Sequence, residues 1–190
     1  MLTALAVSDS GAVALAAFSS ARGSGEIYVL RREATPALAG SAGRVVHLAF
    51  VPNSHNALAA DYDRGQILLL ADGGLDGVQL LAGRGDGVGA PAAVEASTNG
   101  GVFVVNDGSP AVLVLSPVPG GLSGLVECGC AATALLRLRN PDSFQLTAGV
   151  GPLAVLNAER EAPSVFYIPA GEHANQQPVA GTPPARTRKR

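Results

Sequence analysis

The sequence predicts an all-β fold built from repeated units of four short strands. Its apolar residues fall in runs of about four to six that are bounded by Gly, Pro, Asn and Asp, which is typical of strands rather than helices. The 190 residues include 24 Gly and 13 Pro, which supply the turns that such a fold needs. Similar segments recur along the chain at the period of a propeller blade. These observations favour a β-propeller of about four four-stranded blades, either a complete small propeller or a segment of a larger one.

Composition limits the classes of partner. Hydrophobic residues make up 47% of the chain and the formal net charge is −2, so the chain can bury a core. No apolar run reaches the roughly 18 residues that span a bilayer, and no membrane partner is expected. Aromatic residues are 4% of the chain and Trp is absent, which counts against surfaces that stack on nucleic-acid bases.

The first residues indicate a strand, a turn and a second strand rather than a leader. The N-terminus has no basic region, and its apolar stretch is broken at residues 8–11, which argues against a signal peptide. A strand that begins at the first residue is what a chain lacking its upstream sequence would show. Localisation is therefore left open, with an extracytoplasmic location expected if a leader precedes this chain.

The repeats set the expected blade boundaries. Aligning Leu5, Leu48, Val94 and Leu146 gives spacings of 43, 46 and 52 residues by subtraction, close to the period of about 40 to 50 residues of propeller blades. Each unit holds three apolar strands, and residues 36–40, 78–83 and 125–130 fit the outer fourth strand. The expected propeller covers residues 1–170, in blades at about 2–43, 44–89, 90–131 and 132–170. Residues 171–190 are expected to form a disordered basic tail.

Two segments carry a resemblance to a known family. Residues 59–70 and 101–115 each contain a strand, an Asp-containing turn and a second strand, and residues 82–91 form a connector rich in Gly and Asp. These segments resemble the NHL-type repeats of β-propellers, a group related in architecture to WD repeats. The resemblance implies a toroidal binding scaffold, a fold that serves both interaction proteins and enzymes.

Candidate binding residues come from two places in the predicted blades. The loops that follow the second strand of each blade cluster on one face of a propeller, and they contain Arg22, Asp61, Asp63, Arg64, Asn106 and Asp107. The alternative role for Asp and Asn at these positions is to bond the amides of tight turns. The inner strands add His47 and Glu95, which are one residue out of register between blades and are expected to face different sides.

These residues favour a noncatalytic scaffold that binds a protein, a peptide or a small polar ligand. Two titratable inner-strand residues are too few for an enzyme site of converging carboxylates, Asn or His, so no catalytic residue, metal ligand or cofactor is predicted. Two alternatives stay open, namely a metal-assisted hydrolase or lyase on the same ring and a truncated fragment without autonomous function. Unpaired blade edges would favour self-association if the ring is open.

The two cysteines lie two residues apart, at Cys128 and Cys130. In an extended strand their Cα atoms would sit near the upper limit for a disulfide, and no second pair exists to complete a zinc site. The spacing therefore favours two free thiols.

Overall fold

The computed structural model describes residues 1–20, 23–116, 122–148, 153–159 and 162–168 of the chain. In these residues the chain forms sixteen β-strands, two short 3₁₀ turns and no α-helix. No helix that could cross a membrane occurs in this part of the chain. Arg22 and the expected basic tail at residues 171–190 lie outside the described residues.

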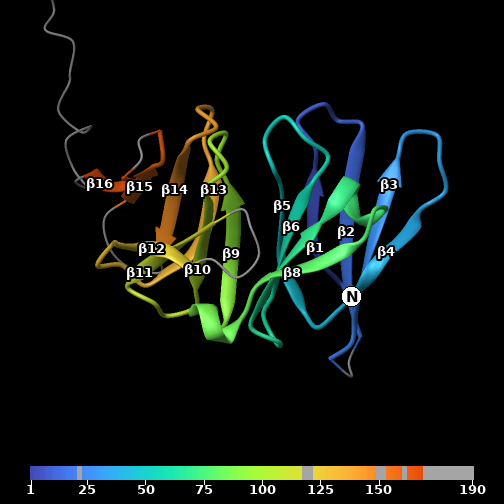
Figure 1. The fold of residues 1–190 in the computed structure, drawn as a ribbon, viewed down its shortest axis with the longest axis horizontal. Helices are drawn as coiled ribbons and strands as arrows, with labels where there is room; N and C mark the ends of the chain where they lie inside the picture. The colour runs from blue at the N-terminus through green and yellow to red at the C-terminus, as the bar shows by residue number, and fades with distance from the viewer. Residues whose placement is uncertain (21–22, 117–121, 149–152, 160–161, 169–190) are drawn as a thin grey trace, which may run out of the picture.

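The strands form four separate antiparallel sheets, each of four strands taken in chain order (Figure 1). We call these sheets blades 1 to 4. Blade 1 contains β1 (Leu2–Val7), β2 (Val13–Ser19), β3 (Gly25–Arg31) and β4 (Ala37–Ala42). Blade 2 contains β5 (Val45–Phe50), β6 (Ala57–Asp61), β7 (Gln66–Leu70) and β8 (Val78–Ala82).

The second half of the chain repeats this plan. Blade 3 contains β9 (Pro91–Ala96), β10 (Val102–Asn106), β11 (Ala111–Leu115) and β12 (Leu122–Glu127). Blade 4 contains β13 (Ala132–Arg137), β14 (Ser143–Ala148), β15 (Leu153–Asn157) and β16 (Ser164–Ile168). The 3₁₀ turns η1 (Ala71–Gly74) and η2 (Arg84–Asp86) flank β8. The prediction of four-stranded blades is confirmed.

The blades pack face to face, and a separate apolar core fills each interface. Alternate residues of a strand point to opposite faces. Each middle strand that lies between two other blades therefore contributes side chains to the cores on both of its faces. Leu15 of β2 is buried between blades 1 and 2, and Leu58 of β6 is buried between blades 2 and 3. Phe103 and Phe144 fill the interface of blades 3 and 4, with ring centroids 5.4 Å apart.

This packing brings the first strands of the four blades together. β5 contacts β1 on one side and β9 on the other, and β13 contacts β9. We therefore call β1, β5, β9 and β13 the inner strands. Because each inner strand ends in a turn to the second strand of its blade, side chains from all four blades meet near those ends.

The register of the fourth repeat differs from the prediction. Leu5, Leu48 and Val94 lie on inner strands opposite Ala16, Ala59 and Val104, whereas Leu146 lies on the second strand of its blade, opposite Leu135. The equivalent inner-strand residue is therefore Leu135. The strand β13 was missed because the alignment took residues 144–148 as the first strand of the fourth unit, whereas they form its second strand.

The expectation of two free thiols is wrong. Cys128 and Cys130 form a disulfide, and their Cα atoms are 5.1 Å apart. The prediction assumed an extended strand, but β12 ends at Glu127 and Gly129 adopts a left-handed conformation with φ of +54°. This turn shortens the distance between the two Cα atoms into the range that a disulfide bridges.

Candidate functional site

A polar cavity lies where the inner strands end, and residues of all four blades line it. Its volume is about 280 Å³. The chemically active side chains are Asp9 from the β1–β2 turn, His47 from β5, Glu95 from β9 and Arg137 from β13. Backbone and apolar residues of β1 and β5 complete the wall.

Arg137 connects the blades at this cavity. Its Nη2 atom donates to Glu95 Oε2 of blade 3 at 2.8 Å and to the carbonyl oxygen of Phe50 in blade 2 at 2.6 Å. Its Nη1 atom lies 3.8 Å from Asp9 Oδ1 of blade 1. A charge-assisted hydrogen bond is stronger than one between neutral groups, so this one side chain holds the ends of several strands in a defined arrangement.

Glu95 is the most perturbed titratable group of the cavity. Burial raises the pKa of the Glu95 carboxyl group from 4.5 to about 7, and the neighbouring Arg137 only partly opposes this effect. A carboxyl group with a pKa near neutrality can donate or accept a proton at neutral pH. A buried acid of this kind, which faces a cavity and pairs with one specific cation, is a candidate functional group.

His47 is held in its neutral form. Burial lowers its pKa, and a hydrogen bond with the backbone of Val94 only partly opposes this. The Nδ1 atom of His47 is buried and has no hydrogen-bond partner within the described residues. The cavity therefore combines one cation with two carboxyl groups and a neutral imidazole.

Sequence reasoning selected two of these four residues. His47 and Glu95 line the same cavity, which corrects the expectation that they face different sides. His47 comes one residue before and Glu95 one residue after an aligned apolar position, so the offset between them is two residues and both point to the same face. Arg137 was missed because β13 was not recognised. Asp9 was missed because Ser8, Asp9, Ser10 and Gly11 form a pattern typical of an ordinary turn.

Asp61 and Asn106 bond the connectors between blades. Asp61 is fully buried, and its Oδ2 atom accepts a hydrogen bond from the Gly43 N–H group at 2.6 Å. Asn106 occupies the equivalent position in blade 3, where it donates to the Gly87 carbonyl oxygen and accepts from the Gly89 N–H group. These bonds fix the segments that enter blades 2 and 3. Both side chains thus bond backbone groups of turns, which is the alternative role that the sequence analysis gave for Asp and Asn at these positions.

The other predicted residues lie near the opposite ends of the inner strands. Asp63 pairs with Arg44 at 3.3 Å, and the Arg44 guanidinium lies 4.4 Å from the centre of the Tyr62 ring. The Tyr62 hydroxyl donates to Asp107 of blade 3 at 3.1 Å. Arg64 lies 3.8 Å from Asp61. Asp63 and Asp107 thus belong to an exposed network that is separate from the cavity of Glu95.

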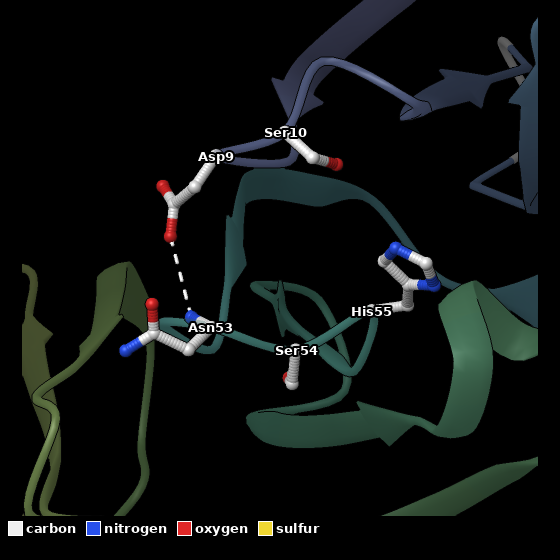
Figure 2. Close-up of a pocket in the computed structure, with 5 residues that line it drawn as sticks. All are labelled: Asp9, Ser10, Asn53, Ser54 and His55. Atoms are coloured by element: carbon white, nitrogen blue, oxygen red, sulfur yellow. Dashed lines mark hydrogen bonds between the residues drawn. The ribbon is translucent and has the colours of Figure 1, made fainter.

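A polar shelf adjoins the entrance of the cavity. Figure 2 shows the residues that line it, which are Asp9, Ser10, Asn53, Ser54 and His55. The Asn53 N–H group donates to Asp9 Oδ2 at 3.4 Å, which joins the turns of blades 1 and 2 (Figure 2). Asp9 lines both the shelf and the cavity, so the two form one continuous polar surface.

In the described ranges, no three His, Cys, Asp or Glu side chains are grouped closely enough to hold a metal ion. The arrangement around Glu95 and Arg137 is instead suited to hydrogen bonding and to proton transfer at the Glu95 carboxyl group.

Comparison with known proteins identifies the fold. No protein-family model matches the sequence, and no curated protein matches it. Virginiamycin B lyase from Staphylococcus aureus, a catalytically inactive variant with quinupristin, is similar with a TM-score of 0.64 and 13% identity, over 89% of this chain and 56% of that chain. A 6-phosphogluconolactonase-like protein from Bacteroides uniformis gives a TM-score of 0.60 and 15% identity, over 86% and 55% of the two chains.

A luciferin-regenerating enzyme is also similar, with a TM-score of 0.57 and 14% identity over 81% of this chain and 53% of that chain. The chain thus spans about half the length of the structures that it matches. Together with the four face-to-face sheets, these likenesses show a β-propeller fold. The resemblance to NHL-type repeats stays a prediction.

Loss of the Asp61 carboxylate should destabilise the fold. In Asp61→Ala the buried N–H group of Gly43 loses its acceptor, which should lower the free energy of unfolding by about 1–3 kcal/mol. The matched variant Asp63→Ala removes a carboxylate that is 40% exposed and pairs with Arg44 at the surface, and we expect a change within about 0.5 kcal/mol. Urea unfolding followed by circular dichroism measures both. Equal effects in the two variants would contradict the connector role of Asp61.

Glu95 should give the stability a pH dependence of known sign. Because the pKa of Glu95 is about 7 in the folded chain and 4.5 ordinarily, the folded state binds the extra proton between these values. The free energy of unfolding should therefore fall by roughly 3 kcal/mol as the pH rises through this window. Glu95→Gln should lack this fall, while any contribution of His47 is common to both proteins. Urea unfolding from pH 4.5 to 7.5 tests this, and parallel profiles would refute it.

Proposed function

We propose that this chain is a noncatalytic propeller scaffold that binds a small polar ligand in the cavity at the ends of the inner strands. The observation that carries the proposal is the convergence of Asp9, His47, Glu95 and Arg137, one from each blade, on that cavity. Buried charged groups cost free energy, and a fold that only needed stability would do as well with apolar residues there. A ligand that uses these groups gives a reason for their presence.

The dimensions and charges of the cavity define the class of ligand. A volume of about 280 Å³ is at the lower end of ligand pockets. With both carboxyl groups ionised, Asp9 and Glu95 outnumber Arg137, whose Nη2 atom is already engaged by Glu95 and Phe50. The site therefore favours a ligand that carries hydrogen-bond donors, such as hydroxyl or ammonium groups, over an anion.

The shelf beside the cavity provides the way in. The Asp9 side chain is 60% exposed, so an incoming ligand meets this carboxylate before it reaches the more buried Glu95. Ser10, Ser54 and His55 add further polar groups on the same surface. A ligand can exchange its bonds to water for bonds to the protein in steps as it enters.

Acid–base catalysis at Glu95 is the second candidate function. It is favoured by the pKa of about 7, which matches the requirement for a general acid or base at neutral pH. Similar structures include a lyase and a 6-phosphogluconolactonase-like protein. Hydrolysis of a small lactone such as γ-butyrolactone that is lost in Glu95→Gln would establish this candidate.

Three probes of similar size and different charge test the binding proposal. Serinol is a cation, glycerol is neutral and glycerate is an anion, and each can be titrated into ¹⁵N-labelled protein at pH 8. We expect amide shifts near residues 47, 95 and 137 to be largest with serinol, smaller with glycerol and smallest with glycerate. Glu95→Gln should weaken serinol binding by about tenfold, because a charge-assisted hydrogen bond is lost.

Asp107→Asn provides the matched control, since it removes a carboxylate from the exposed network away from the cavity. Serinol should bind this variant as it binds the wild type. Shifts that spread evenly over the surface, a preference for glycerate, or equal losses in the two variants would each overturn the proposal.

A further inference from the structure

The outward face of blade 1 is apolar, and none of the other described blades packs on it. The Leu5 and Val7 side chains on it are 61% and 57% exposed, and Phe18 is 41% exposed. Tyr28 and Leu30 of β3 lie on the same face, around a hollow that is lined mainly by apolar atoms. A surface with this many exposed apolar side chains marks an interaction site.

The equivalent residues of blade 2 indicate how this face of blade 1 packs. Strand pairing aligns Leu5, Ala14, Ala16 and Leu30 of blade 1 with Leu48, Ala57, Ala59 and Leu70 of blade 2. All four of these blade 2 residues are buried against blade 1. The outward face of blade 1 therefore has the composition of a surface that packs on a preceding blade.

Blade 4 presents the other half of such an interface. Leu136, Leu153, Phe166 and Ile168 are 50%, 41%, 57% and 40% exposed. Strand pairing aligns Leu153 with Val112 of blade 3 and Ile67 of blade 2, and both of these are buried against the following blade. The outward face of blade 4 is thus equivalent to a surface that packs on a following blade.

These two faces do not meet within the chain. Among the described residues, no sheet pairing and no apolar core joins blade 1 to blade 4. The two blades lie at opposite ends of the arrangement in Figure 1. The contact of Asp9 with Arg137 at 3.8 Å links them at the inner strands.

We propose that a second copy of this chain covers both faces and closes a ring of eight blades. The outward face of blade 1 in one copy packs on the outward face of blade 4 in the other, and the two-fold axis repeats the contact. Each new interface has the same kind of blade-to-blade contact as the three apolar cores between successive blades of one chain. A closed cyclic assembly satisfies every such face, and eight blades lie within the usual range for propellers.

The comparisons agree with this stoichiometry. Each similar structure is about twice as long as the part that this chain covers, with 53–56% of its length matched. Two copies restore approximately the length of one such propeller. The sequence favours self-association through unpaired strand edges. The exposed apolar side chains of blades 1 and 4 add whole sheet faces to the surface through which two copies can associate.

The mass in solution tests the proposal. Sedimentation equilibrium of the full chain should give twice the monomer mass of 19.0 kDa. Leu5→Asp on blade 1 and Phe166→Asp on blade 4 should each weaken association at least tenfold, because each interface uses both faces. Leu80→Asp changes a Leu of the outer strand β8 that is 51% exposed, and it should leave the dimer unchanged. Circular dichroism and a cooperative thermal transition show that each variant is folded.

A mixture of the two variants distinguishes a closed ring from a dimer with another interface. In a mixed dimer, one interface carries both substitutions and the other carries neither, so Leu5→Asp and Phe166→Asp proteins should associate with each other more tightly than either does with itself. A folded monomer at all concentrations, open polymers, aggregates that melt without cooperativity, or a dimer that only one variant disrupts would overturn the proposal.

Discussion

Each blade of this chain buries a face against the next blade, and small side chains make that contact close. Ala57 and Ala59 of β6 are fully buried in the core between blades 1 and 2, so the middle strand of blade 2 presents small side chains to blade 1. Larger residues such as Leu15 and Phe103 fill the remaining space. This face-to-face packing fixes the angle between successive blades, and that angle decides where the inner strands end.

The candidate site is a consequence of that geometry. Because the inner strands converge, Arg137 of blade 4 reaches the Glu95 carboxylate of blade 3 and the Phe50 carbonyl of blade 2. The same packing removes water from Glu95, and burial raises its pKa to about 7. Stability and chemistry are therefore coupled at this point, since the contacts that order the strand ends also create an acid that titrates near neutrality. The connector bonds of Asp61 and Asn106 set the start of blades 2 and 3 and support the same arrangement.

The sequence predicted the repeat, the four-stranded blades and their all-β character, because turn residues and apolar runs are local signals. It did not predict β13, because the alignment took residues 144–148 as the first strand of the fourth unit, whereas they form its second strand. Arg137 lies on that strand and was therefore not predicted as a site residue. The Cys128–Cys130 disulfide was missed because it depends on the left-handed conformation of Gly129. The shared cavity of His47 and Glu95 depends on contacts between blades, which no single repeat encodes.

The central claim is that blades 3 and 4 meet through Glu95 and Arg137 at the common end of the inner strands. A double-mutant cycle with Glu95→Gln and Arg137→Met, read out as the free energy of unfolding at pH 8, tests it most directly. Contact between the two side chains predicts a coupling energy of about 1–3 kcal/mol, with the double variant less destabilised than the sum of the single variants. Additive effects would show that the two side chains do not interact and would contradict the account.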